Sequence, residues 1–523
     1  MYTIKQIFAS RRNFYILLFA GMVLRTFPFG FTYFPILDDP NAYGIFSIHP
    51  LPELWRHVVL HYYLYAFRPL AGLVDAYIYS RFWGNMQWVL LFIMTLQFST
   101  IFLLDEIARI SKIGWGRAAA VFFVFFPAST ESAYWINASS RIVMSVFLAA
   151  LAGYALLRYL NRQRWQSGRG WLGLMLGAGL AAQGFYEQGI IFTFVFLMGL
   201  LFLHREQVRK FWLWLWPMAN VGIIGIHYLI FRNHGHLAER TGLAGGISHF
   251  PETAARIGRT FIREQFPTIT NGLDWGFAEL GAGRLIIIAI FAILLTLFVI
   301  YDKPPDFDIG RTIAAGVILI AAPLSIFFIL ADGWIWVRNF YFSLIGLGIL
   351  VNIIYGFLIQ QNSITKVAGG LICGIMVFLF AGGFVLEVQS YGRVAEKDGI
   401  IIHKLAQELA RQDTDDREVW FFGLRWTYAP TINDRITSPL RLDWALNGHL
   451  GAYTRQRERP WIIPVMNGQP APINPGDLLF GLSQDPETGE LFVKNLIYYN
   501  GILVIYDNAL NFGRITDGNF WQD

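Results

Sequence analysis

The sequence has one cysteine, few charged residues and none of the common nucleotide-binding motifs. A single thiol, Cys373, excludes an internal disulfide and a metal site built from cysteines. Charged side chains make up only 15% of the 523 residues, fewer than soluble globular proteins carry. No Gly-rich or Walker A motif stands between a predicted strand and a predicted helix, which argues against a nucleotide-sugar or ATP site. The net charge of +5 is dispersed over short loops, so we predict no nucleic-acid partner.

Apolar residues, in contrast, are abundant and grouped into long runs. Hydrophobic side chains make up 55% of the sequence and aromatic ones 17%. Runs of about 18–20 apolar residues are long enough to cross the hydrocarbon core of a lipid bilayer. We therefore predict an all-α polytopic membrane protein with about 11 transmembrane helices. The predicted spans are 14–31, 83–104, 117–131, 140–159, 171–186, 188–203, 212–231, 284–301, 312–331, 339–359 and 367–386.

The lysines and arginines predict how the chain crosses the membrane. They cluster before the first span and in every second loop after it, as in cytoplasmic loops. The N-terminus is therefore expected in the cytoplasm of a plasma (inner) membrane protein, with an uncleaved first span because no small-x-small site follows it. The longer connections, 32–82 and 232–283, then lie outside, as does everything after 387. The cytoplasmic loops show basic residues but no paired set of acids and arginines.

The composition changes near residue 387, where the charge density rises. We predict a transmembrane module over 1–386 and a small extracytoplasmic α+β domain over 387–523. Its predicted elements are a helix from Asp398 to Arg411, strands at 419–424, 478–482, 491–497 and 501–506, and a turn at 485–489. This domain contains no catalytic motif.

The loop after the first span carries two adjacent acids, Asp38 and Asp39. Two carboxylates side by side outside a membrane span repel each other, which favours proton uptake by one and suits it to act as a general base. A polar turn before Pro40 is the alternative interpretation. Asp38 is the favoured base, because Asp39 precedes proline, is restricted in its backbone angles and is therefore expected to serve the turn itself.

Further charged residues fall at the outer ends of predicted spans. Arg68 precedes Pro69 after a predicted interfacial helix, where a snorkelling arginine is the alternative. Glu131 and Arg141 flank a tight turn and are either functional or a bracing ion pair. Other candidates are Glu187 at the next outer turn, Arg338 and Tyr341 after Asp332, and Arg256, Arg259 and Arg263 on one face of a predicted helix.

In this order, the motifs resemble those of the GT-C superfamily of polytopic glycosyltransferases. The series is the acidic pair, Arg-Pro-Leu at 68–70, Pro-x-x-x-Glu at 127–131 with Arg141 downstream, Glu187, and Arg-x-Phe-Tyr at 338–341. The similarity covers roughly residues 14–355 and is strongest to the membrane half of the tetratricopeptide-linked and protein O-mannosyltransferases.

The resemblance implies inverting transfer of one sugar from a polyprenyl-phosphate carrier to an acceptor hydroxyl at the outer membrane face. It implies that the catalytic acid is Asp38 or Asp39, and that Arg141 and Arg338 lie near the donor phosphate. This chain lacks the tetratricopeptide repeats and has Tyr186-Glu187 where those relatives usually have Lys-Glu. The acceptor, whether protein, glycan or lipid, therefore stays open, as does the sugar.

Two other functional classes share some of these features. A lipid-linked glycan polymerase or ligase would have outer arginines and a large outer loop late in the membrane part, whereas the long loops here follow spans one and seven. A lipid-linked sugar transporter would show polar residues near mid-span and an internal repeat, and the sequence shows neither. Glu53, His57 and His61 fit an interfacial stripe better than a metal site. No metal site or cofactor is predicted, and a requirement for a divalent cation stays open.

Overall fold

The computed structural model describes most of the chain in two compact units. The first unit comprises Met1–Thr32, Trp55–Val74 and Gln87–Val388, and the second comprises Tyr33–Leu54, Asp75–Met86 and Gln389–Asp523. Parts of the connection that follows the first predicted span thus belong to the same compact unit as the C-terminal segment. The described residues are 4–60, 68–161, 168–208, 210–231, 249–302, 307–328, 335–361, 363–414, 417–456, 460–466, 476–485, 488–499, 502–505, 514–516 and 519–521.

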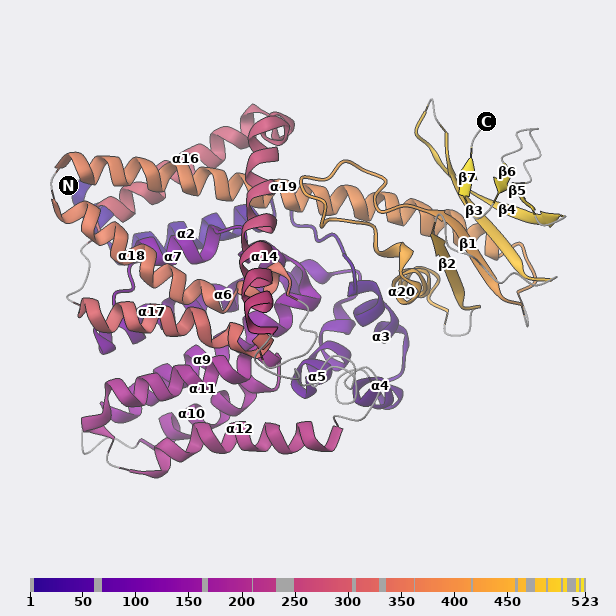
Figure 1. Cartoon of the computed structure of the whole chain (residues 1–523). Helices are drawn as coiled ribbons and strands as arrows, with labels where there is room; N and C mark the ends of the chain where they lie inside the picture. Colours follow the sequence, from indigo (N-terminus) through magenta and orange to yellow (C-terminus); the bar gives the residue numbers. More distant parts are fainter. Residues whose placement is uncertain are drawn as a thin grey trace. The chain divides into compact units, whose positions relative to one another are not determined.

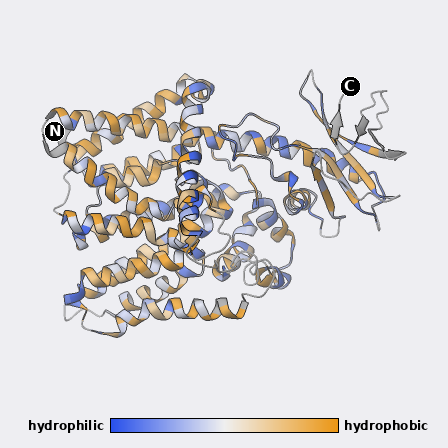
Figure 2. Cartoon of the chain, in the orientation of Figure 1, coloured by the Kyte–Doolittle hydropathy of each residue, from blue (hydrophilic) through white to orange (hydrophobic). Residues whose placement is uncertain are grey.

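The first unit is a bundle of apolar helices, which confirms the predicted fold class (Figures 1 and 2). Each predicted span coincides at least in part with one helix. These helices are α2 (Arg11–Thr26), α6 (Met86–Ser111), α7 (Arg117–Phe125), α9 (Ile136–Leu160), α10 (Arg169–Gln183), α11 (Glu187–Leu203), α12 (Trp212–Phe231), α16 (Ala282–Ile300), α17 (Ile309–Leu324), α18 (Ser343–Gln361) and α19 (Ser363–Leu409). A short helix, α1 (Ile4–Ala9), precedes them.

Five helices of the described residues are long and apolar enough to cross a membrane. They are α6, α9, α16, α17 with its 3-10 extension to Phe328, and α19, so the protein is an integral membrane protein. The apolar helices α11 and α18 are shorter. The number of about 11 transmembrane helices remains a prediction.

Prolines explain where two predicted spans end early. The first span was expected to reach residue 31, but α2 ends at Thr26 because Phe27 precedes Pro28 and leaves the helical conformation. The span predicted over 117–131 is wrong as a single helix, since α7 ends before Pro127. Nine residues give α7 a length of about 13 Å, less than half a bilayer core. A separate short helix, α8 (Ser129–Tyr134), follows.

Small residues allow close helix packing inside the first unit. A Cβ atom added to Gly346 of α18 would lie 2.3 Å from the carbonyl oxygen of Gly316 in α17. Contact of backbone with backbone at this point requires glycine on both helices, as in many membrane helix pairs. The described residues between these two helices form two 3-10 turns, η7 (Ser325–Phe328) and η8 (Val337–Phe340).

One polar helix, α14 (Phe250–Asn271), runs across the ends of the bundle helices instead of along them (Figure 1). It confirms the helix predicted to carry the three arginines. A π-helical turn, η6 (Gly272–Gly276), and α15 (Phe277–Leu280) connect it to α16. The Gly-rich stretch at 242–246 lies outside the described residues.

Helix α19 is one continuous helix of 47 residues, where two separate helices were predicted. At 1.5 Å per residue it is about 70 Å long, more than twice the thickness of a hydrocarbon core. The predicted apolar span 367–386 and most of the predicted helix 398–411 thus belong to the same unbroken helix. The division between the two units falls within it, between Val388 and Gln389.

The second unit contains short helices from the first outer loop. A π-helical turn, η1 (Pro40–Ile45), leads into α3 (Phe46–Ile48), and a 3-10 turn, η3 (Tyr79–Phe82), lies further along. The described part of the predicted interfacial helix is α4 (Leu51–Val58), and residues 61–67 lie outside the described residues. Helix α5 (Pro69–Tyr77) follows, and the division between the two units falls within both helices.

A mixed β-sheet forms the rest of the second unit. Its strand order is β2-β1-β3-β4-β5-β6-β7, with β1 parallel to both β2 and β3 and the remaining pairs antiparallel. The strands are β1 (Val419–Leu424), β2 (Ile462–Met466), β3 (Leu478–Gln484), β4 (Leu491–Tyr499), β5 (Ile502–Ile505), β6 (Arg514–Thr516) and β7 (Asn519–Trp521). Helix α20 (Asp443–Thr454) and the end of α19 pack on one face, with Phe421 and Phe480 at the centre of the core.

Four of these strands were predicted, and the turn at 485–489 is confirmed. Gly489 has φ +69°, a conformation that favours glycine, and its N–H donates to the Asp485 carbonyl. Strand β2 was missed because Pro464 interrupts its hydrophobic run. Proline is tolerated there since β2 is an edge strand with only one neighbour.

Candidate functional site

The candidate site lies in the first unit and includes an ion pair between Arg68 and Glu187. The Arg68 Nε lies 2.8 Å from Glu187 Oε1, and the guanidinium lies 4.6 Å from the centroid of the Tyr186 ring. The backbone holds Arg68 in place, since the N–H of Leu70 donates to the Gly184 carbonyl at 3.0 Å. Glu187 begins α11, where the helix dipole stabilises its negative charge.

A second ion pair joins Arg338 of η8 to Glu131 of α8. Arg338 Nη1 lies 2.6 Å from Glu131 Oε1, and the two side chains are 23% and 6% exposed. The guanidinium also lies over the Trp135 ring at 4.8 Å, and the Ser132 hydroxyl donates to the Arg338 carbonyl at 3.1 Å. Both the side chain and the backbone of Arg338 are therefore fixed against α8.

Asn339 connects the two ion pairs. Its Nδ2 donates to the Tyr186 hydroxyl at 3.0 Å and to Gln188 Oε1 at 3.1 Å. Gln188 Nε2 in turn donates to the carbonyls of Asn339 and Pro323. Because Asn339 follows Arg338 in the chain, one polar network extends from Arg68 to Glu131. We call these residues, Arg68, Glu131, Tyr186, Glu187, Gln188, Arg338 and Asn339, the arginine network.

The arginine network joins residues that lie far apart in the sequence. Sequence analysis selected Arg68, Glu131, Glu187 and Arg338 separately, and the structure brings these four together. Asp332 lies outside the described residues. Gln188 and Asn339 were missed, although each stands next to a selected residue, because an uncharged amide at a helix end is usually a cap.

Several buried polar atoms around the network lack a hydrogen-bond partner among the described residues. They are Thr130 Oγ1, Glu131 Oε2, Trp135 Nε1 and both side-chain polar atoms of Gln183. Buried polar atoms are normally paired, so a group of unpaired donors and acceptors indicates a place for water or a polar ligand. Hydroxyl groups, which both donate and accept, would satisfy this mixture.

Arg141 and Tyr341 occupy different positions relative to the network. Arg141 is a half-buried residue in the second turn of α9. The Glu131 ion pair that the structure shows is with Arg338, whereas the bracing alternative paired Glu131 with Arg141. Tyr341 is fully buried, with its ring 5.1 Å from that of Phe123.

A buried arginine in the first helix was missed by sequence analysis. Arg25 is 3% exposed, and its Nη2 donates to Gln97 Oε1 at 2.9 Å. Its guanidinium also contacts the Val124 carbonyl and lies 4.3 Å from the centroid of the Phe384 ring. Sequence analysis could have selected Arg25, because a charged residue inside an apolar run is costly and is usually paired or functional.

Arg25 lines an apolar cavity of about 120 Å³ in the first unit. Arg284, near the start of α16, is the second cation of the lining and lies 4.6 Å from the centroid of the Phe29 ring. The remaining lining includes Ile287, which is 50% exposed, so the cavity borders the outer surface of the bundle. Two cations in an apolar lining fit an amphiphile with an anionic group.

An ion pair also joins two loops that were predicted to be cytoplasmic, so the expectation that these loops hold no paired acids and arginines was wrong. Arg117, at the start of α7, pairs with Asp302 at 3.2 Å. It also donates to the backbone carbonyls of Phe8, Ala9 and Phe298. By binding three carbonyls and one carboxylate, the Arg117 guanidinium joins separate segments of the chain, which is a structural role.

Asp38 and Asp39 belong to the second unit, and they differ in environment. Asp39 is completely buried, and its Oδ2 accepts a hydrogen bond from the Tyr33 hydroxyl and another from the Ile36 N–H, the latter at 3.0 Å. Asp38 is half-buried. Leu37 before it has φ +48°, a conformation that a bulky side chain rarely adopts.

A third acid of the second unit, Asp75, was missed. It is fully buried, and its Oδ1 accepts a hydrogen bond from the Tyr43 hydroxyl at 3.0 Å. Tyr43 lies on η1, which begins directly after Asp39. Asp75 stands in a short apolar helix, and nothing in its neighbours predicted a partner 32 residues away. The buried carboxylates of Asp39 and Asp75 thus stabilise, through hydrogen bonds, the segment that contains Asp38.

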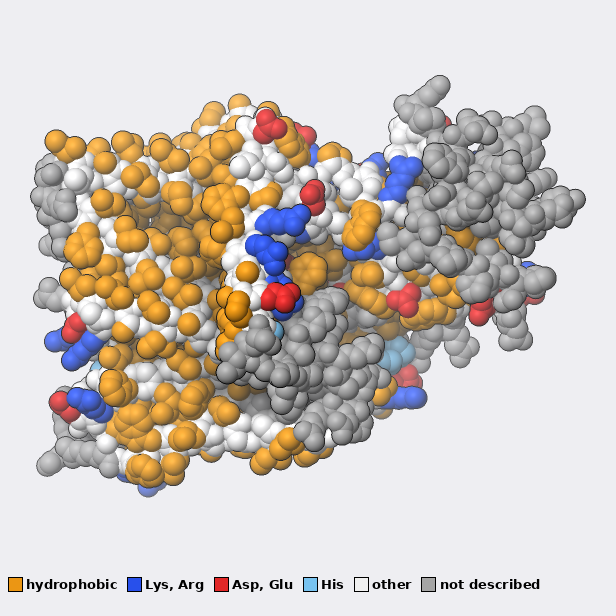
Figure 3. Space-filling model, viewed as in Figure 1, with side chains coloured by type: hydrophobic (Ala, Val, Ile, Leu, Met, Phe, Trp, Pro, Cys, Tyr) orange, Lys and Arg blue, Asp and Glu red, His pale blue; other side chains and the backbone are white. Residues whose placement is uncertain are grey.

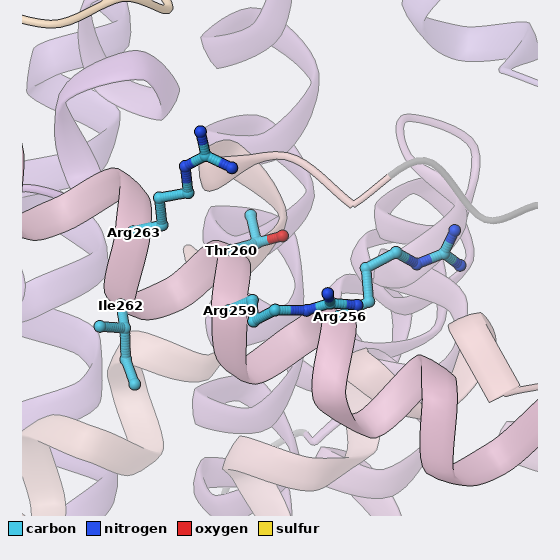
Figure 4. A pocket seen from close by; sticks show the side chains of 5 residues that line it. All are labelled: Arg256, Arg259, Thr260, Ile262 and Arg263. Carbon is cyan, nitrogen blue, oxygen red and sulfur yellow. The ribbon is translucent and has the colours of Figure 1, made fainter.

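The arginines of α14 form a separate cationic surface. Arg256, Arg259 and Arg263 line a cavity of about 410 Å³ together with Thr260 and Ile262 (Figure 4). Figure 3 shows the basic side chains gathered on this face of the molecule beside apolar ones. Over the described part of the chain, no group of three or more His, Cys, Asp or Glu side chains is placed to hold a metal ion.

Comparison with known proteins gives one similar structure. No family model and no curated protein sequence matches this chain. The crystal structure of ArnT from Cupriavidus metallidurans in the apo state is similar over 92% of this chain and 94% of that chain, with 13% sequence identity and a TM-score of 0.35. At this degree of similarity, the function has to be inferred from the residues of this chain.

Proposed function

We propose that this protein is a membrane glycosyltransferase of the GT-C type, which transfers a sugar from a polyprenyl-phosphate donor to an acceptor hydroxyl at the outer membrane face. The observation that carries the proposal is the arginine network, in which Arg68 and Arg338 lie at one end of a bundle of apolar helices. A lipid-linked phosphate sits at the boundary between head groups and hydrocarbon. It requires cations at that depth, next to apolar surface.

The chemistry needs a base and stabilisation of the leaving group. The acceptor oxygen attacks the anomeric carbon from the side opposite the phosphate, the bond from that carbon to the phosphate oxygen breaks, and the configuration inverts. The acceptor proton passes to a carboxylate, for which we propose Asp38, since Asp39 already accepts two hydrogen bonds from its own turn. Polyprenyl phosphate leaves with both electrons of the broken bond.

Arginine side chains suit the leaving phosphate. As the bond breaks, negative charge grows on the phosphate oxygens, and a guanidinium can donate to two of them at once. We assign this role to Arg338 and Arg141, with Arg68 as a further cation. Glu131 and Glu187 orient Arg338 and Arg68 through their ion pairs. The unpartnered polar atoms of Thr130, Trp135 and Gln183 are suited to sugar hydroxyls.

The remaining parts have roles consistent with this reaction. The cavity beside Arg25 and Arg284 offers apolar surface and cations for part of the lipid. The positive-inside pattern supports a cytoplasmic N-terminus and a C-terminal domain outside the plasma membrane. We propose that the C-terminal segment from 387 helps to select the acceptor.

Product analysis tests the proposed reaction. Purified protein in detergent is incubated with polyprenyl-phosphate hexoses and pentoses and with candidate acceptors, and the released lipid is identified by mass spectrometry. We expect polyprenyl monophosphate from the wild-type protein and none above background from Asp38→Asn. Polyprenyl-diphosphate oligosaccharides are supplied in a parallel reaction, and release of polyprenyl diphosphate from them, with no release from the monophosphate donors, would identify a polymerase or ligase instead. Transport of intact donor across vesicles that contain the protein, without release of the lipid, would identify a transporter.

A further inference from the structure

We propose that α14 is an interfacial helix whose arginines bind the phosphate groups of anionic phospholipids, so that it anchors the outer end of the bundle to the membrane surface. This inference goes beyond the proposed sugar transfer and does not depend on it. It rests on the direction of the helix, the order of residues around it and the contacts of its inner face.

The direction of α14 is that of a helix lying in the membrane plane. Figure 1 shows α14 crossing the ends of the bundle helices, some of which are long enough to span a bilayer. The helix ends at Asn271, and the membrane-length helix α16 begins only eleven residues later, at Ala282. A helix tied so closely to the start of a span lies near head-group depth.

The residues around α14 form the two adjacent strips that an interfacial helix needs. Each residue advances the position around a helix by about 100°. Arg256, Arg259 and Arg263 therefore fall within about 60° of one another, and Ile262 and Phe266 follow directly beside them. Ile262 is 58% exposed and Phe266 56% exposed. An apolar strip next to a cationic strip meets hydrocarbon and phosphate at the same time.

The opposite face of α14 is held by the rest of the first unit. The Phe261 ring stacks on that of Phe126 at 5.8 Å and meets the edge of Phe340 at 5.1 Å. Near the end of the helix, the Thr268 hydroxyl donates to Glu387 at 2.6 Å. The buried face is thus fixed, and the arginines are presented on the other side, where Arg259 and Arg263 are exposed (Figures 3 and 4).

The charge of the exposed face favours an anionic partner. Helix α14 carries three arginines, Arg256, Arg259 and Arg263, and two acids, Glu252 and Glu264, so its net charge is +1. An anionic bilayer surface strengthens binding by about fivefold for each arginine near it. The exposed apolar strip selects a lipid surface over a soluble anion, since it would stay in water if the partner were soluble.

Fluorescence quenching in vesicles tests this assignment with the full chain. Thr260 lines the arginine cavity, so a bimane label on Thr260→Cys, in a Cys373→Ala background, reports on lipids around α14. The labelled protein is reconstituted into phosphatidylcholine vesicles that contain a small fraction of brominated phosphatidylglycerol or, separately, the same fraction of brominated phosphatidylcholine. We expect both to quench the label and the phosphatidylglycerol to quench severalfold more.

Charge variants distinguish a specific surface from general attraction. Replacing Arg256, Arg259 and Arg263 by Gln should remove the preference for phosphatidylglycerol, whereas replacing all three by Lys should keep most of it. The matched control replaces three exposed arginines of the second unit, Arg411, Arg417 and Arg455, by Gln and should keep the preference. If the triple Gln variant does not fold, each single Gln variant should lose part of the preference.

Three results would overturn the proposal. Absence of quenching by either lipid would place α14 away from the membrane surface. Equal quenching by both lipids would remove the anionic preference. A change in label emission on adding inorganic tripolyphosphate, without lipid quenching, would assign the surface to a soluble anion.

Discussion

The ion pair between Arg338 and Glu131 allows a bracing role to be separated from a role in donor binding. Both residues are largely buried, at 23% and 6% exposure, and their charged atoms lie 2.6 Å apart. Arg338→Met leaves the Glu131 carboxylate buried without its cation. Such a loss costs about 3–5 kcal/mol in a buried pair, and the partial exposure of Arg338 places the expected cost near the lower end, about 3 kcal/mol.

The double variant separates the two roles. Glu131→Gln with Arg338→Met has no buried charge, so most of the lost stability should return. Affinity for polyprenyl phosphate should not return, because the phosphate has lost a charge-assisted hydrogen bond worth about 1.5–3 kcal/mol, or roughly tenfold to a hundredfold in Kd. Thermal unfolding in detergent measures the stability, and titration with undecaprenyl phosphate measures the affinity. Wild-type affinity in the folded double variant would refute the phosphate-binding role of Arg338.

Three further predictions concern the second unit. Asp39→Asn should lower the free energy of unfolding by about 1–3 kcal/mol, since the carboxylate accepts hydrogen bonds from Tyr33 and Ile36. Asp38→Asn should abolish transfer even in the folded fraction of the protein, and loss of transfer in folded Asp39→Asn alone would exchange their roles. Gly44→Ala should lower the free energy of unfolding by about 1–3 kcal/mol, because the added Cβ would lie 2.3 Å from that of Ala452. The control Gly399→Ala, whose Cβ would meet nothing within 4 Å, should leave the stability unchanged, and equal effects would argue against η1 packing on α20. Burial of the His449 ring, whose Nε2 has no partner among the described residues, lowers its pKa to about 4. The second unit should therefore lose stability as the pH falls from about 6.5 towards 4, and His449→Phe should remove that part of the pH dependence in acid unfolding.

The sequence predicted what depends on local patterns. Long apolar runs predicted the bundle helices, and the three arginines at helical spacing predicted α14. The position before Pro40 predicted that Asp39 serves the turn, and its carboxylate accepts hydrogen bonds from Tyr33 and Ile36. The assignment of Asp38 as the base stays a prediction.

Long-range partners could not be predicted in the same way. The pairing of Glu131 with Arg338 spans 207 residues, and it depends on how α17 and α18 pack, which glycines such as Gly346 decide in three dimensions. The placement of η1 with the C-terminal segment was missed for the same reason, because the contact of Gly44 with Ala452 leaves no periodic signal. Arg25 was missed for a different reason, since a charged residue inside an apolar run can be recognised in the sequence and was not selected.

A structure of the protein with bound polyprenyl phosphate would test the central claim most directly. The claim is that the arginine network, together with Arg141, receives the phosphate of a lipid-linked sugar. A cryo-electron microscopy map of the purified chain with undecaprenyl phosphate should show the phosphate within hydrogen-bonding distance of Arg338, Arg141 or Arg68. A phosphate bound at the other end of the bundle, beside Arg117, would contradict the claim.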